Sequence, residues 1–113
     1  MMRIMLRSKL HRLTVTETNI SYEGSITVDK SLIRAADILP GERVQVVNLN
    51  NSERFETYVI EGGRGVVCLN GAAARLAAPG DKVIVIAYAM VEEGDAQKLK
   101  PKIILVDERN KMK

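Results

Sequence analysis

Residues 35–46 read AADILPGERVQV, and residues 74–85, which lie 39 positions further along the chain, read ARLAAPGDKVIV. Each copy combines a short helical piece, a Pro-Gly turn followed by an acidic and a basic residue, and a strand with alternating apolar side chains. Pro-Gly turns are common by themselves, but agreement of helix, turn and strand together is less easily accidental. Two such copies in a chain of 113 residues predict a pseudo-twofold β-barrel made from two interlocked halves.

The rest of the chain also favours strands over helices. We expect strands at residues 10–16, 25–28, 43–49, 54–61, 66–69, 82–89 and 102–107, and short helices at 30–38 and 72–77. Asp29 precedes the first helix and is expected to cap it, with Leu32, Ile33 and Ala36 on the buried side. The polar connector at residues 92–95 is expected to be exposed.

Two side chains that could take part in chemistry lie at the start of the first of these strands, Lys9 just before it and His11 within it. Alternation predicts that Lys9 and His11 share one face with Leu13 and Val15, in line with the core. His11 has two interpretations, a core histidine with satisfied hydrogen bonds or a member of a site next to Lys9. The pattern alone leaves both interpretations open.

Composition is typical of a single globular domain. The 113 residues are 46% apolar but only 4% aromatic, which favours a compact aliphatic core. No apolar run approaches the ~18 residues of a membrane helix, and residues 1–7 lack the apolar region of a signal peptide. We therefore expect one soluble, cytoplasmic domain over residues 1–113 that does not bind membranes.

The charge pattern bears on nucleic-acid binding. The formal charge is +3, but basic and acidic residues are interspersed, and only residues 98–113 are visibly basic. A phosphate-binding arm is one interpretation of this stretch, and a solvated tail, frayed over residues 108–113, is the favoured one. One Phe and three Tyr form no platform for stacking bases, so we expect no nucleic-acid partner.

Reactive side chains are scarce. With one His, one Cys and no Trp, the chain can assemble neither a metal cluster nor a Cys–His pair from one copy, and we expect no metal ion. Cys68, in an apolar run, is interpreted as a small buried hydrophobe. If the chain is an enzyme, its electrophile has another source. Ser25 follows Gly24, and a serine hydroxyl can attack the preceding peptide carbonyl where glycine tolerates an unusual backbone conformation.

Several short motifs occur in an order and spacing shared by one family. They are Met5-Leu6, Lys9-Leu10-His11-Arg12, Tyr22-Glu23-Gly24-Ser25, Arg54-Phe55, Thr57-Tyr58 and Asn70-Gly71-Ala72-Ala73-Ala74. Through them the chain resembles, over nearly its whole length, the aspartate 1-decarboxylases. These are pyruvoyl-dependent lyases that convert L-aspartate to β-alanine and CO2 for pantothenate and coenzyme A synthesis. The resemblance implies a mainly β fold, a double-psi six-stranded barrel with short helices, assembled as a homotetramer with active sites between subunits.

The resemblance also implies how the chain matures. Ser25 Oγ would attack the Gly24 carbonyl to form an ester, and β-elimination followed by hydrolysis with loss of ammonia would leave a pyruvoyl group. The products would be residues 1–24 and residues 25–113, the latter capped by this covalent cofactor. The pyruvoyl carbonyl would form a Schiff base with aspartate and accept electrons as the α-carboxylate leaves. Spontaneous maturation and maturation by a helper protein both agree with this chemistry.

The other site residues are implied by the same resemblance. Tyr58 would be the proton donor, and Asn70 would support the oxyanion during self-cleavage at Gly24, in which His11 and Tyr22 would also take part. Residues implied to bind substrate are Lys9, Arg54, Thr57, Gly71, Ala72 and Ala73. Arg54 suits this role because its planar guanidinium can grip a carboxylate with two parallel hydrogen bonds.

Alternatives accompany these assignments. Without the resemblance, Arg54 is equally well explained as a solvated residue of an amphipathic strand, and Tyr22 as a packing residue before the cleavage turn. Thr57 and Tyr58 lie on opposite faces of one strand, so both line one site only if the strand is bulged or lies at a subunit boundary. The alternative function is a non-catalytic β-barrel that binds nucleic acid or protein, in which Gly24-Ser25 is only a turn.

Overall fold

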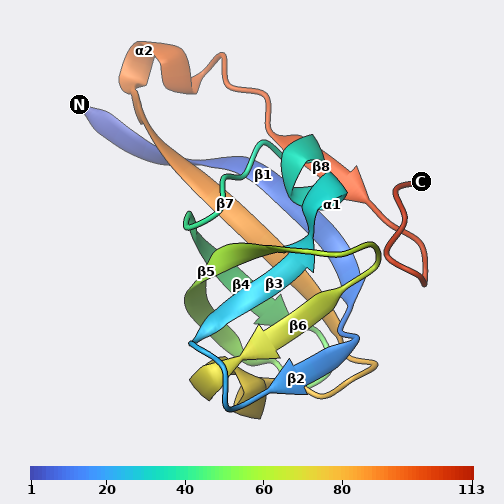
Figure 1. The fold of residues 1–113 in the computed structure, drawn as a ribbon. Coiled ribbons are helices and arrows are strands. Elements are labelled where there is room, and N and C mark those ends of the chain that lie inside the picture. The colour runs from blue at the N-terminus through green and yellow to red at the C-terminus, as the bar shows by residue number, and fades with distance from the viewer.

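The computed structural model describes residues 1–113, and strands dominate it (Figure 1). Eight strands form one mixed sheet in the order β2-β6-β3-β5-β4-β7-β1-β8. The strands are β1 (Met2–Thr14), β2 (Glu17–Asn19), β3 (Ser25–Asp29), β4 (Arg43–Asn48), β5 (Arg54–Gly62), β6 (Val67–Asn70), β7 (Lys82–Glu92) and β8 (Lys102–Leu105). The helices are α1 (Lys30–Ala35), the 3₁₀ helix η1 (Gly71–Leu76) and α2 (Glu93–Ala96). The chain is therefore mainly β, and its curled sheet is that of a small β-barrel, as predicted.

The internal repeat corresponds to two strands that pair with each other. Val46 of β4 lies opposite Val85 of β7 in an antiparallel pair, and the two valines occupy equivalent positions of the repeat. Such self-equivalent pairing is what a twofold axis between the two strands requires. The turns match as well, because Gly41 and Gly80 both have left-handed backbone angles, with φ of 87° and 95°. The predicted pseudo-twofold arrangement is confirmed.

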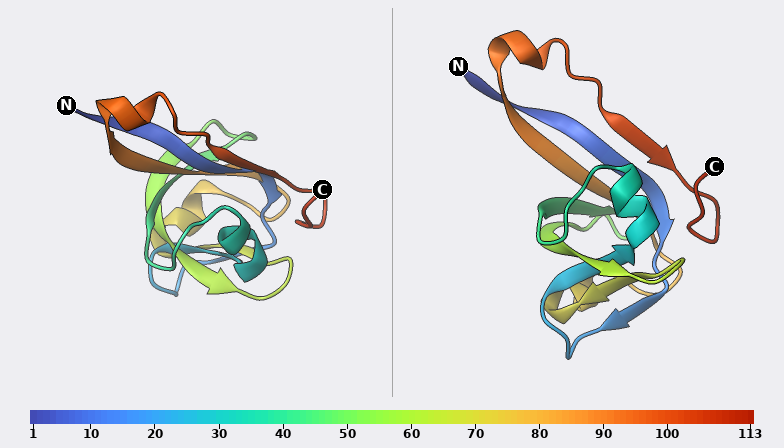
Figure 2. Two further views of the ribbon diagram at one scale, coloured as in Figure 1. Left: turned by 90° about the horizontal axis from the view of Figure 1, so that it is seen from above. Right: turned by 45° about the horizontal axis from the view of Figure 1, so that its top comes forward.

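One cluster of 19 buried apolar residues fills the interior. The inward side chains alternate along the strands, as in β4, where Val44 and Val46 are buried and Arg43 is exposed. Helix α1 packs beside β3 and β5 (Figure 2). The long strands β1 and β7 run past the barrel, and α2 lies at their far end (Figure 2). None of the helices combines the length and the apolar content that crossing a bilayer would need.

Most expected elements exist, with shifted ends. The N-cap is confirmed, because Asp29 accepts hydrogen bonds from the backbone N–H and the hydroxyl of Ser31. The first helix ends at Ala35 rather than at residue 38, because Asp37 adopts a left-handed φ of 58°. The short strand β2 was not expected. The polar connector at residues 92–95 is exposed as expected, except for the half-buried Glu93. It overlaps the short helix α2, whose last residue, Ala96, is buried.

The predicted face of the first strand is confirmed for Leu13 and Val15, which are buried, but is wrong for Lys9 and His11. Leu10 and Leu13 both lie in the core, whereas Lys9 and His11 lie half-buried outside it. The register of β1 against β7 shifts between Leu10 and Leu13, where Arg12 has a φ of 67°. This bulge inserts one extra residue and reverses the alternation, which simple period-two reasoning cannot anticipate.

The carboxyl-terminal tail is also held more firmly than expected. Asn110 is only 2% exposed, and its side-chain oxygen accepts a hydrogen bond of 2.7 Å from Thr14 N–H. Its amide group donates to the carbonyl oxygens of Thr14, at 2.9 Å, and Gly65, at 3.0 Å. The buried amide of Asn110 thus connects the tail to the barrel through three hydrogen bonds, while the other residues of 108–113 are exposed and their fraying stays a prediction.

Candidate active site

Ser25 opens strand β3, directly beside the last residue of β6. In this antiparallel pair Ser25 lies opposite Asn70, and Thr27 lies opposite Cys68. Ile26 and Leu69, between them in sequence, point into the core and are fully buried. The four polar residues therefore share the other face of the β3–β6 pair, where their side chains can contact one another.

The Ser25 hydroxyl is held from two sides. It donates a hydrogen bond of 2.9 Å to the carbonyl oxygen of Glu23 and accepts one of 3.0 Å from Asn70 Nδ2. Ser25 is fully buried, whereas the preceding Gly24 is exposed. The structure thus brings the predicted nucleophile and Asn70 together, next to the peptide bond that the nucleophile would attack.

Gly71, the first residue of η1, also reaches this peptide bond. Its φ is 63°, and a Cβ at this position would lie 2.6 Å from the Cα of Gly24 and 3.1 Å from the carbonyl oxygen of Tyr22. Only glycine allows this approach together with this backbone angle. Tyr22 is 51% exposed, so within one chain it is not a core packing residue.

Tyr58 lies beside Ser25 on the opposite flank from Asn70. Val59 pairs with Ile26 in the parallel β3–β5 ladder, and Tyr58 and Ser25 are the residues that precede them. Because Val59 and Ile26 both point into the core, Ser25 and Tyr58 share the other face. Tyr58 is 36% exposed.

Thr57 faces the opposite way. It pairs with Val44, a core residue, and the β4–β5 register runs without a shift from Arg43↔Tyr58 to Val47↔Arg54. The structure therefore removes a bulge as the way to bring Thr57 and Tyr58 into one site. Within one chain, Thr57 and Tyr58 therefore lie on opposite faces of β5.

Arg54 shares the outer face of β5 with Tyr58. Arg54 Nη1 donates a hydrogen bond of 3.0 Å to Gln45 Oε1, which also accepts one of 2.7 Å from the Tyr88 hydroxyl. The sequence analysis assigned no role to Gln45 or Tyr88. Their alternation with buried valine and alanine neighbours on β4 and β7 was the only available signal that they face outward.

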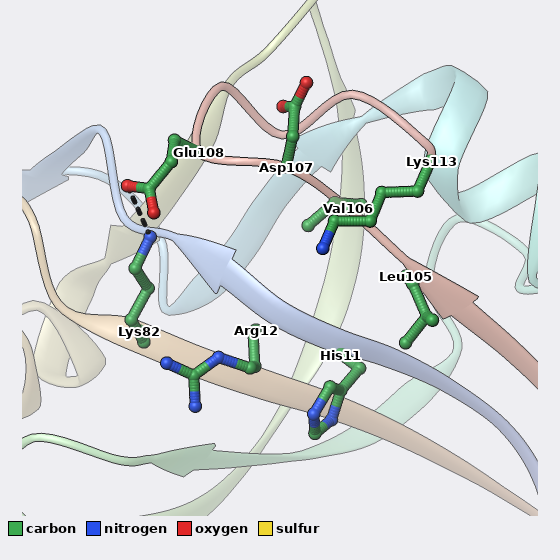
Figure 3. A pocket seen from close by; sticks show the side chains of 8 residues that line it. All are labelled: His11, Arg12, Lys82, Leu105, Val106, Asp107, Glu108 and Lys113. Carbon is green, nitrogen blue, oxygen red and sulfur yellow. Dashed lines mark hydrogen bonds and ion pairs between the residues drawn. The ribbon is translucent and has the colours of Figure 1, made fainter.

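Lys9 and His11 lie elsewhere in the chain. Strands β5, β4 and β7 stand between β3 and β1 in the sheet, and Lys9 and His11 lie on β1, beside Ile103 and Leu105 of β8. A hollow of about 310 Å³ next to His11 is lined by β1, the start of β7 and the tail (Figure 3). Within one copy, the structure does not bring these two residues to Ser25.

Cys68 and Thr27 contact Asn70, and no sequence motif predicted these contacts. Cys68 Sγ lies 3.2 Å from Asn70 Oδ1, and Asn70 Nδ2 lies 2.9 Å from Thr27 Oγ1. Burial, and then the negative charge of Glu17, raises the pKa of the Cys68 thiol, so the group stays protonated and can donate. The two-residue spacing from Ser25 to Thr27 was a signal that both share one face.

Comparison with known proteins identifies the family of the chain. The family model described as aspartate decarboxylase matches residues 1–113. The chain belongs to the aspartate decarboxylase family. It is 62% identical over 110 residues to an aspartate 1-decarboxylase of Pelotomaculum thermopropionicum, covering 96% of this chain and 83% of that relative. It is 56% identical over 113 residues to that of Thermoanaerobacter pseudethanolicus, covering 98% of this chain and 97% of the relative. The family resemblance drawn from the motifs is thus confirmed over the whole chain.

Proposed function

We propose that this chain is a pyruvoyl-dependent aspartate decarboxylase that converts L-aspartate to β-alanine and CO2 for pantothenate synthesis. The observation that carries the proposal is the Ser25 hydroxyl, buried and held between Glu23 O and Asn70 Nδ2 beside the exposed Gly24. Membership of the aspartate decarboxylase family supports the substrate and the reaction type.

Self-cleavage would begin at this hydroxyl. Ser25 Oγ bonds to the carbonyl carbon of Gly24 while the bond from that carbon to the Ser25 nitrogen breaks, and the hydroxyl proton passes to the nitrogen. The Asn70 amide would donate to the oxygen that gains negative charge, as an oxyanion-stabilising group does. Loss of the Ser25 α-proton and of the Gly24 carboxylate leaves dehydroalanine, and one water then releases ammonia and leaves the pyruvoyl group on residues 25–113.

The residues present fit such a group. Ser25 is the only reacting residue required, and its neighbour Gly71 leaves no side chain against Gly24. The pyruvoyl carbonyl supplies an electrophile for the substrate amine and an electron acceptor for the leaving carboxylate. Tyr58 Oη, on the same face as Ser25, would return a proton to the substrate α-carbon.

The substrate would be bound by residues from more than one copy. We assign its carboxylates to Arg54 and Lys9, and the pocket wall to Thr57 and residues 71–73. Lys9 lies apart from Ser25 within one chain, which supports active sites shared between subunits of a homotetramer. We also propose that the enzyme is located in the cytoplasm. Its maturation is either spontaneous or assisted by a helper protein.

Denaturing mass spectrometry tests the proposal. We expect wild-type protein to give two fragments, residues 1–24 and 25–113, the longer of which reacts with a carbonyl reagent. The Ser25→Ala variant is expected to stay intact and to release no CO2 from aspartate. An intact wild-type chain without carbonyl reactivity would favour the non-catalytic barrel, and decarboxylation by Ser25→Ala would refute the role of Ser25.

A further inference from the structure

We propose that Cys68 and Thr27 are positioning residues for self-cleavage, which together hold the side-chain amide of Asn70 with its N–H groups directed at Ser25. The inference rests on the proposed self-cleavage and deepens it. It concerns two side chains on the same face of the β3–β6 pair as Ser25 and Asn70.

The Ser25 end of this network permits only one orientation of the amide. The carbonyl oxygen of Glu23 can only accept a hydrogen bond, so the Ser25 hydroxyl donates its single proton to that oxygen. Ser25 Oγ can then only accept from Asn70. The NH₂ group of Asn70, not its oxygen, must therefore face Ser25.

The far end of the amide is held by the thiol. Asn70 Oδ1 points away from Ser25 and lies 3.2 Å from Cys68 Sγ. Asn70 is 2% exposed, so this oxygen is largely shielded from bulk solvent. Since a protonated thiol donates to the oxygen, Cys68 favours the same orientation that Ser25 requires.

Thr27 completes the set by accepting the second N–H of Asn70, at 2.9 Å. The Thr27 methyl group lies beside Gly62, where a Cβ would come within 2.6 Å of Thr27 Cγ2. The absence of a side chain at Gly62 leaves room for the rotamer in which the Thr27 hydroxyl faces Asn70.

The Asn70 side chain is not used to cap the helix that follows it. Asp29 precedes α1 and uses its side chain to cap that helix. Asn70 precedes η1 at the corresponding position but makes no side-chain cap hydrogen bond. The Asn70 amide instead forms its hydrogen bonds with Ser25, Thr27 and Cys68.

Two pairs of variants test the inference. Cys68→Ala removes the thiol that donates to Asn70, and Thr27→Val removes the hydroxyl that accepts from it. Cys68→Ser and Thr27→Ser each keep a hydroxyl at the same position. Full-length chains are made in a short cell-free pulse, and the intact chain is followed over time by denaturing mass spectrometry. Loss of one partner is expected to slow cleavage roughly fivefold to tenfold, the rate equivalent of one net hydrogen bond. The two serine variants are expected to stay within about twofold of wild type, a difference too small to count as the loss of a hydrogen bond.

Turnover and stability separate positioning from a general structural role. Once cleavage is complete, aspartate turnover per pyruvoyl group is expected to match wild type in all four variants. Thermal melting checks folding, and the Thr27 pair keeps the test decisive if Cys68→Ala is unstable. Wild-type cleavage rates in both Cys68→Ala and Thr27→Val would overturn this inference but not the proposed function. The same would follow if the two serine variants cleaved as slowly as Cys68→Ala and Thr27→Val. A wild-type chain that never cleaves would overturn the proposed function and the inference with it.

Discussion

Gly71 lies against Gly24 so closely that a Cβ on Gly71 would come within 2.6 Å of the Gly24 Cα and 2.7 Å of its nitrogen. The two glycines are far apart in sequence, but the start of η1 lies against the loop that leads into β3. The backbone on the amino-terminal side of the Gly24-Ser25 bond therefore lies directly against the backbone of Gly71, and a side chain at position 71 would displace it.

We expect Gly71→Ala to abolish or strongly slow self-cleavage, on the order of 100-fold. Alanine is disfavoured at a φ of 63°, and its Cβ would push the Gly24 backbone away from the Ser25 hydroxyl. The measurement is the fraction of intact chain by mass spectrometry. Gly94→Ala, where a Cβ has open space, serves as the control. Normal cleavage by Gly71→Ala would show that this approach is unimportant.

Gly62→Ala is expected to slow cleavage through Thr27. The new Cβ would meet Thr27 Cγ2 at 2.6 Å, and a β-branched side chain on a strand has little freedom to move away. Crowding of this kind also destabilises the fold by about 1–3 kcal/mol. Cleavage rate and denaturant unfolding are measured together. The adjacent Gly63→Ala, with nothing near its Cβ, should behave as wild type.

Tyr58→Phe is expected to separate maturation from turnover. The variant keeps the aromatic ring but loses the hydroxyl that would protonate the substrate, so turnover should fall by about 10²–10⁴-fold. Self-cleavage is expected to survive, because Ser25 makes its hydrogen bonds to Glu23 and Asn70. Fragment masses and CO2 release from aspartate are the two measurements. Near-normal turnover would refute the proton-donor role.

The pH dependence of stability is expected to report on Asp29. Burial alone would raise the pKa of Asp29, but hydrogen bonds from Gly65 N–H and from Ser31, with the charge of Arg64, outweigh it and lower the pKa below 3.8. A lowered folded pKa means that the ionised group stabilises the fold above about pH 4, and that this contribution is lost as the pH falls through the folded pKa.

Asp29→Asn tests this directly. An amide NH₂ in place of one carboxylate oxygen would face an N–H donor, so we expect a loss of about 1–3 kcal/mol at pH 7. The difference from wild type should stay constant down to about pH 5 and shrink below pH 4. Urea unfolding at a series of pH values measures it. A difference that grows on acidification would contradict the assigned direction.

Asn110→Gly is expected to loosen the tail. Glycine accepts the left-handed φ of 62°, so the variant removes only the side chain and its hydrogen bonds to Thr14 and Gly65. We expect a loss of roughly 1–3 kcal/mol in unfolding free energy, because the half-buried backbone groups of Thr14 and Gly65 lose their hydrogen-bond partner. Lys111→Ala, an exposed neighbour, is the matched control. Equal stability of the two variants would show that the anchor is weak.

Local patterns predicted much of the fold correctly. The strands, both Pro-Gly turns, the Asp29 cap and the internal repeat depend on residues close together in sequence, where side-chain alternation and turn chemistry act directly. The face of Lys9 and His11 was wrong because a single bulge at Arg12 reverses every later side chain. The anchored tail was missed because the partners of Asn110 belong to other parts of the barrel.

The candidate reaction could be predicted from local sequence motifs and the family they resemble. Only Gly24-Ser25 offers a reactive group, and the motifs around it predict the family. Tertiary structure alone decided which side chains meet Ser25. Asn70 is 45 residues from Ser25 in the sequence. Its partner Cys68 was interpreted from the sequence as a small buried hydrophobic residue. Cross-strand contacts follow from pairing and register, which are set when the whole core packs, so no short stretch of sequence contains them.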